Sequence, residues 1–115
     1  MAQEPHHIDR QALETLARDV GQPMVDNIIE SFLEETAARL GLMRLHLEQR
    51  DTIRLQADAQ VVRSAAAAMG FASLSEKARK FEGEVASMSV NDAAQWVEQL
   101  AEIFDESCNQ LNPPD

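Results

Sequence analysis

The stretch AQVVRSAAAAMG, residues 59–70, decides the fold. Alanine is the strongest helix former, and a glycine such as Gly70 is typical of the residue that ends a helix. Asp51 is placed to cap the start of the same helix. Apolar residues recur between these ends at steps of four and three, as expected for one buried helix face. That buried stripe is predicted to contain Leu55, Ala59, Val62, Ala66 and Met69.

The opposite face of this helix carries mostly small side chains. Gln60, Ser64 and Ala67 share that face, with Ala57 and Arg63 along its margins. Solvated helix faces normally carry long charged residues, so a face of small side chains indicates a partner that approaches the helix backbone closely. The alternative is that alanine serves only as a good helix former on the surface. The pattern favours neither interpretation. Asp58, at the edge of the buried stripe, is expected to reach solvent.

Two helices are predicted before this stretch. Asp9 caps a short helix that Gly21 ends, and its apolar residues are Leu13, Leu16 and Val20. Pro23 then lies in the first turn of a long helix that runs to about Gln49. The apolar positions of the long helix, again at steps of three and four, are Val25, Ile29, Phe32, Thr36, Leu40, Met43 and Leu47.

Two more helices are predicted after it. Ser73-Leu-Ser-Glu76 has the form of a capping box, and the helix it starts bears Leu74, Ala78, Phe81 and Val85. Ser89-Val-Asn-Asp92 resembles a second such start. The last helix, which Asn112-Pro-Pro ends, bears Ala93, Val97, Leu100, Ile103, Phe104 and Leu111.

Short connections between long amphipathic helices predict an all-α fold. The expected architecture is an up-and-down antiparallel four-helix bundle with a short additional N-terminal helix. The whole chain has 115 residues, which fits one domain. We expect a flexible N-terminal tail at residues 1–7, a single domain at 8–112 and a C-terminal tail at 113–115.

Composition excludes several classes of function. Twenty acidic and ten basic residues give a net charge of −10, which repels a phosphate backbone, so no nucleic-acid partner is expected. No apolar run approaches the ~20 residues that span a bilayer, and the N-terminus lacks a signal-peptide pattern. We therefore expect a cytoplasmic protein without a membrane partner. The single cysteine, Cys108, excludes an internal disulfide and is interpreted as a packing residue.

The stretch and its flanks resemble the histidine-containing phosphotransfer (HPt) domain of bacterial multistep phosphorelays. The motif of that family is roughly Ala-His-x-Leu-Lys-Gly-Ser-Ala-x-x-Leu-Gly, followed by a Leu and a later Leu-Glu pair. This chain has AQVVRSAAAAMG, then Leu74 and Phe81-Glu82. The resemblance covers residues 8 to about 85 without a gap, and upstream it includes Ile8-Asp9, Leu13, residues 16–21, Ile28-Ile29, residues 32–35 and Arg39-Leu40.

The resemblance implies partners and also a loss. The partners that it implies are response-regulator receiver domains and hybrid histidine kinases. The protein itself is expected to be a monomer and to need no cofactor. Gln60 stands where the family has its phosphoryl-accepting histidine, Arg63 replaces the lysine, and Ser64 replaces the glycine. A carboxamide nitrogen is not nucleophilic, because its lone pair is delocalised into the carbonyl. The resemblance thus implies a pseudo-HPt protein that binds receivers without transferring phosphate, through a docking surface of Ala57, Gln60, Arg63, Ser64, Ala67, Ala68 and Phe71.

Two alternatives stay open. One is an active phosphotransfer protein that uses another histidine, such as His46, although local spacing does not place His46 on the Gln60 face and a boundary or exposed position is expected for it. The other is a structural bundle that binds partners but has lost receiver binding. His6 and His7 fall in the tail, and with no third ligand at fixed spacing no metal site is expected.

Overall fold

The structure is a computed structural model that describes residues 6–111 of the chain. The helices it contains are α1 (Arg10–Val20), α2 (Gln22–Glu48), α3 (Thr52–Ala68), α4 (Ala72–Glu84) and α5 (Val90–Leu111), with a 3-10 turn, η1 (Val85–Ser87), between the last two. The five predicted helices are thus confirmed.

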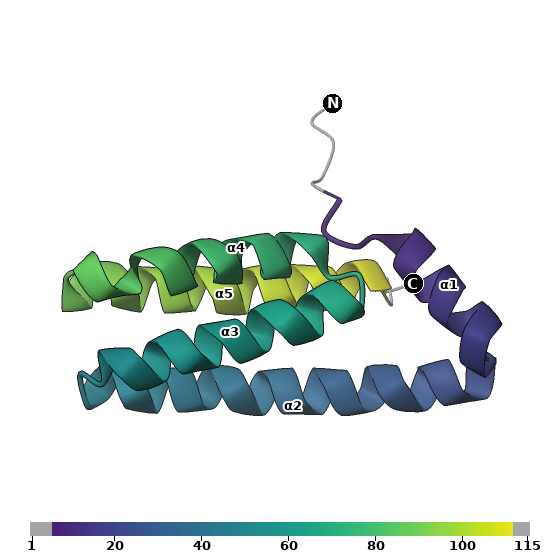
Figure 1. Cartoon of the computed structure of the whole chain (residues 1–115), viewed down its shortest axis with the longest axis horizontal. Helices are drawn as coiled ribbons and strands as arrows, with labels where there is room; N and C mark the ends of the chain where they lie inside the picture. The colour runs from purple at the N-terminus through teal and green to yellow at the C-terminus, as the bar shows by residue number, and fades with distance from the viewer. Residues whose placement is uncertain (1–5, 112–115) are drawn as a thin grey trace.

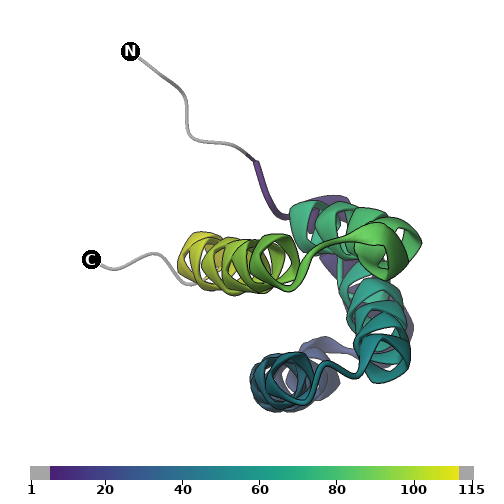
Figure 2. The same ribbon diagram turned by 90° about the vertical axis from the view of Figure 1, so that its left-hand side faces the viewer.

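The helices α2 to α5 form an antiparallel bundle. Figure 1 shows α2, α3, α4 and α5 running back and forth along the long axis, and Figure 2 shows the same helices nearly end-on. The shorter α1 lies at the end of the bundle where α2 begins and α5 ends (Figure 1). This arrangement confirms the predicted helical bundle with an additional N-terminal helix.

Side-chain caps start three of the helices. Asp9 Oδ1 accepts a hydrogen bond from the Gln11 N–H at 3.1 Å, and Asp51 Oδ1 accepts one from the Arg54 N–H at 3.1 Å. Ser89 Oγ accepts one from the Asp92 N–H at 3.1 Å. These contacts satisfy N–H groups that have no partner inside a helix, so all three predicted starts are confirmed.

The predicted capping box at Ser73 is wrong. Helix α4 begins at Ala72, two residues before the start at Leu74 that the box requires, and Phe71 is its N-cap residue. The Ser73 N–H donates instead to the His7 carbonyl at 3.2 Å. The N-terminal segment therefore satisfies a donor that a capping side chain would otherwise bind. The predicted end at Asn112-Pro-Pro lies outside the described residues.

The core confirms most of the predicted stripes. In α3 the stripe from Leu55 to Met69 is buried throughout, and in α4 the predicted apolar residues are all buried. Phe71 joins Phe32 and Phe104 in an aromatic cluster, with ring centroids 4.7 and 6.5 Å from that of Phe71. Val20 is an exception, because it is 44% exposed in the last turn of α1, where the chain turns into α2 at the end of the bundle.

The segment before α1 is docked on the bundle. His7 is 6% exposed, and its N–H donates to Gln110 Oε1 of α5 at 2.9 Å. The Asp9 N–H donates to the Gly70 carbonyl at 2.6 Å. Gly70 has a φ of +74°, and a Cβ there would lie 2.5 Å from the Asp9 oxygen, so only glycine fits. His7, at the end of the predicted N-terminal tail, thus packs on the bundle, while residues 1–5 of that tail lie outside the described residues.

No helix within residues 6–111 combines the length and the apolar character needed to cross a membrane.

Candidate functional site

The outward side of α3 presents five of the seven residues predicted for docking. Together they form what we call the α3 face, and all of them are exposed: Ala57, Gln60, Ser64, Ala67 and Ala68. Apart from the carboxamide of Gln60, their side chains are no larger than a hydroxymethyl group. The small side chains of the α3 face would let a partner approach the helix backbone closely. Gln60 has the longest side chain of this face.

Arg63 lies at the margin of the α3 face and is bound to α4. Its Nε donates to Glu82 Oε2 at 2.7 Å, and the two side chains are 34% and 26% exposed. The Arg63 carbonyl also accepts a hydrogen bond from Ser75 Oγ at 3.1 Å. The guanidinium is therefore held in place by its neighbour and is only partly open to solvent.

Phe71 cannot take part in a docking surface, and this part of the prediction is wrong. Its side chain is 0% exposed and packs between Phe32 and Phe104. The physical reason is the left-handed turn at Gly70, which reverses the chain after α3 and directs the next side chain into the core.

A shallow groove runs beside the α3 face, between α2 and α3. This α2–α3 groove has a volume of about 250 Å³. Leu42 and Val61 on its walls are 40% and 45% exposed, so they bring exposed apolar surface to the groove. Both are apolar residues outside the predicted buried stripes, a signal that is visible in the sequence. The lining residues are Phe32, Glu35, Thr36, Ala38, Arg39, Leu42, Val61, Val62 and Ala65.

The inward side of α3 holds a buried polar network. Asp58 is only 2% exposed, so the prediction that it reaches solvent is wrong. Its Oδ1 accepts a hydrogen bond from Arg39 Nη1 at 3.1 Å, and its Oδ2 lies 2.5 Å from His46 Nδ1. Two partners from α2 thus compensate the cost of burying this carboxylate.

The same network explains why His46 is buried rather than exposed. The residue is 8% exposed, whereas a boundary or exposed position was expected, and its Nδ1 is engaged by Asp58. A phosphoryl acceptor must bring a ring nitrogen into line with the phosphorus atom of a receiver. The His46 side chain is only 11% exposed and its Nδ1 is held by Asp58, which argues against the alternative that His46 carries phosphate.

Within residues 6–111, the other histidine and cysteine side chains lie apart from the α3 face. His7 Nε2 lies 2.8 Å from Glu106 Oε2. Burial raises the pKa of the Cys108 thiol, with a smaller contribution from the charge of Asp105, so the thiol stays protonated near neutral pH. In the part of the chain that the structure describes, no three His, Cys, Asp or Glu side chains are arranged to hold a metal ion.

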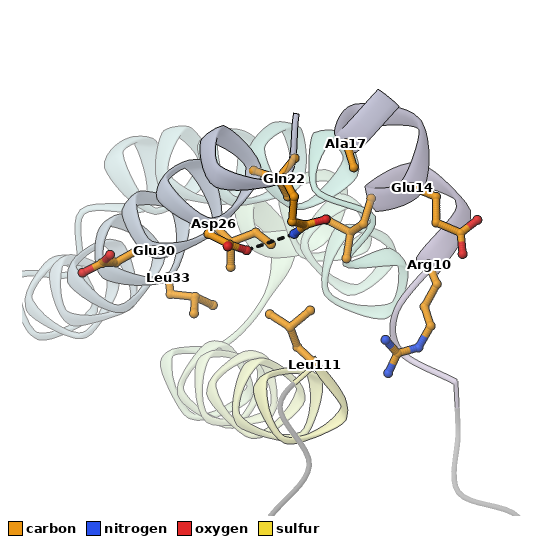
Figure 3. Close-up of a pocket in the computed structure, with 11 residues that line it drawn as sticks. Arg10, Glu14, Ala17, Gln22, Asp26, Glu30, Leu33 and Leu111 are labelled. Carbon is orange, nitrogen blue, oxygen red and sulfur yellow. Dashed lines mark hydrogen bonds between the residues drawn. The ribbon is translucent and has the colours of Figure 1, made fainter. Parts of the chain in front are cut away.

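A larger pocket lies away from these residues, between α1, α2 and the end of α5 (Figure 3). Its volume is about 530 Å³, and none of the predicted site residues lines it. Gln22 Nε2 donates to Asp26 Oδ1 at 3.0 Å, and Arg10 Nη2 donates to the Gln110 carbonyl at 2.6 Å. These polar groups already satisfy one another, so the pocket offers no evident reactive centre.

Comparison with known proteins identifies the family. The Hpt domain model matches residues 27–110, which is more than half of the chain. The crystal structure of histidine-containing phosphotransfer protein B (HptB) from Pseudomonas aeruginosa PAO1 superposes with a TM-score of 0.83 over 90% of each chain. The sequence identity is 18%, so this likeness concerns the fold. No curated protein matches the chain significantly. The chain belongs to the Hpt domain family, whose members are phosphotransfer proteins of phosphorelays.

Proposed function

We propose that this protein docks onto receiver domains of response regulators without carrying the phosphoryl group. The single observation that supports the proposal is the position of Gln60. It is exposed near the middle of the α3 face, where the family motif has its reactive histidine. In this proposal the protein keeps the docking surface of the family but lacks the histidine nitrogen that accepts the phosphoryl group.

The chemistry of a carboxamide separates binding from transfer. A neutral imidazole offers a lone pair that can attack phosphorus, whereas the amide nitrogen of Gln60 has no available lone pair. The same carboxamide has donors and an acceptor, so it can still form hydrogen bonds with a receiver. The protein can therefore bind a receiver through Gln60 but cannot accept a phosphoryl group at this position.

The shape of the surface supports a protein partner. The small side chains of the α3 face allow a receiver to approach the helix backbone. Leu42 and Val61 of the α2–α3 groove add exposed apolar area beside it, which suits a modest, transient interface. We therefore extend the predicted docking surface to this groove and replace Phe71 with these two residues. Receiver domains of hybrid histidine kinases belong to the same class of partner. In this proposal the protein is a cytoplasmic monomer that binds the receiver domains of response regulators and of hybrid kinases.

A binding screen tests the proposal. Purified receiver domains from the source organism are titrated with the wild-type protein, and calorimetry gives the dissociation constant. Ala67→Glu places a charge and a long side chain on the α3 face, so we expect it to weaken binding at least about tenfold. Ala86→Glu, in the exposed η1 turn at the other end of α4, is the matched control and should leave binding unchanged.

Two results would contradict the proposal. One is that no receiver binds at concentrations on the order of tens of micromolar. The other is that a receiver binds but Ala67→Glu has no effect, because the α3 face would then serve only as helix surface, as the structural-bundle alternative requires.

A further inference from the structure

Two arginines border the α3 face, and each is already bound to a carboxylate. On the α4 side, Arg63 Nε donates to Glu82 Oε2 at 2.7 Å. On the α2 side, Arg39 Nη1 donates to Asp58 Oδ1 at 3.1 Å. Because each positive charge lies against a negative charge, neither guanidinium presents an uncompensated charge beside Gln60.

The next cation along the same edge of α4 is paired as well. Arg79 lies three residues before Glu82, hence on the same side of the helix. Its guanidinium binds both carboxylate oxygens of Glu76, at 2.6 and 3.1 Å. The net charge of −10 adds a field that repels anions from the whole molecule. The surroundings of the α3 face are therefore poor in free positive charge.

We infer that Glu82, by holding Arg63, makes receiver binding insensitive to phosphorylation of the receiver. This inference rests on the proposed function. A phosphoryl group on the receiver aspartate would add about two negative charges opposite Gln60. Only Nε of Arg63 is bound to Glu82, at 2.7 Å, so its Nη groups can still donate to a phosphoryl oxygen. The negative charge of Glu82 stays beside the guanidinium, however, and offsets the attraction between Arg63 and the phosphoryl group.

Gln60 does not change this balance. Its carboxamide can donate a hydrogen bond to a phosphoryl oxygen, but it brings no charge. A phosphorylated receiver thus binds no more tightly than an unphosphorylated one. The protein would sequester receivers in both states, and Glu82 would be the residue that sets this lack of discrimination.

The test compares one receiver in two states. The receiver retained most tightly in the binding screen is titrated with and without beryllium fluoride, a phosphoryl analogue that attaches to the receiver aspartate. For the wild-type protein we expect the two dissociation constants to agree within about twofold. Glu82→Gln keeps the shape of the side chain but frees the charge of Arg63, so we expect a preference of about threefold to tenfold for the beryllofluoride form.

Two further variants isolate the cause. Glu84→Gln removes an exposed carboxylate two residues away and should leave the ratio of the two dissociation constants at the wild-type value. Arg63→Gln combined with Glu82→Gln should return that ratio to the wild-type value, because the freed charge is gone. Circular dichroism melting curves establish that each variant is folded, and the ratio is independent of small losses of overall affinity.

The possible outcomes are distinct. A wild-type protein that prefers the beryllofluoride form by about fivefold or more overturns the inference but leaves the proposed function standing. A Glu82→Gln ratio equal to that of the wild type also overturns it. If no receiver binds in either state, the proposed function fails, and the inference fails with it.

Discussion

The two sides of α3 use polar residues in opposite ways. On the outward side, Gln60 and Ser64 are exposed among alanines. On the inward side, Asp58 is buried and holds Arg39 and His46 from α2. The chain thus holds the imidazole of His46 in a buried position on α2 and presents the carboxamide of Gln60 in an exposed position on α3. Our proposal that the protein carries no phosphate rests on this difference in exposure and residue type.

The largest loss of stability is expected from a substitution on the inward side of α3, in the network around Asp58. Asp58→Ala leaves His46 buried without its partner and Arg39 unpaired, so the free energy of unfolding should fall by about 2–4 kcal/mol. Denaturation in urea measures this loss. Glu34→Ala, an exposed carboxylate in the middle of α2, is the control and should change stability by less than about 0.5 kcal/mol. Equal losses in the two variants would show that the network contributes nothing.

The turn that separates α3 from α4 gives the next largest effect. Gly70→Ala should lower the free energy of unfolding by about 2 kcal/mol, because φ is positive and the new Cβ meets the Asp9 carbonyl. Gly83→Ala adds the same methyl group inside α4, where nothing lies within 4 Å, and should be neutral or slightly stabilising. A Gly70→Ala protein as stable as the wild type would contradict the close packing of the N-terminal segment.

A smaller effect is expected at His46. His46→Leu removes the Nδ1 partner of Asp58 but leaves Arg39 bound, so the loss should be about 1–2 kcal/mol. His46→Asn places a side-chain amide near the position of Nδ1 and should recover part of the lost free energy of unfolding. Urea denaturation again provides the measurement. Losses that are the same for leucine and asparagine would show that packing, and not the contact with Asp58, explains the burial of His46.

The smallest effect is expected from an exposed ion pair of similar chemistry. Arg44 binds Glu98 between α2 and α5 at 3.0 Å, with both side chains at least half exposed. Glu98→Gln should therefore change the free energy of unfolding by less than about 0.5 kcal/mol near neutral pH. A loss as large as that of Asp58→Ala would contradict the contrast between exposed and buried pairs.

The pH dependence of this exposed pair has a definite sign. The hydrogen bond from Arg44 is the main reason why the pKa of Glu98 lies below its usual value. A carboxyl group whose pKa is lower in the folded state stabilises the protein above its unfolded-state pKa. That contribution is lost as the pH falls through the folded-state pKa. The difference between wild type and Glu98→Gln should accordingly vanish in acid, which urea denaturation at a series of pH values would show.

Periodicity predicted what each helix does by itself. The apolar stripe of α3 and the caps at Asp9, Asp51 and Ser89 depend on residues two to four positions apart, and all were confirmed. The α3 face followed from the same spacing, and its docking role stays a prediction. These features are local, so one sequence contains the information that determines them.

The errors concern contacts between segments far apart in the chain. The burial of Asp58 depends on Arg39 and His46, 19 and 12 residues away. The first turn of α4 has a partner in His7, whose carbonyl accepts a hydrogen bond from the Ser73 N–H. The burial of Phe71 depends on Phe32 of α2 and Phe104 of α5, between which its ring packs. Spacing along one helix carries no information on such partners.

The most direct test of the central claim is phosphoryl transfer itself. A receiver that binds in the screen is labelled with radioactive phosphate, mixed with the wild-type protein or with Gln60→His, and the acid-labile label on each is counted. We expect no label on the wild type and clear label on Gln60→His, because the new imidazole supplies the missing nucleophile. Acid-labile label on the wild type that is lost in His46→Leu would contradict the account. An unlabelled Gln60→His protein would contradict the claim that Gln60 alone removes transfer.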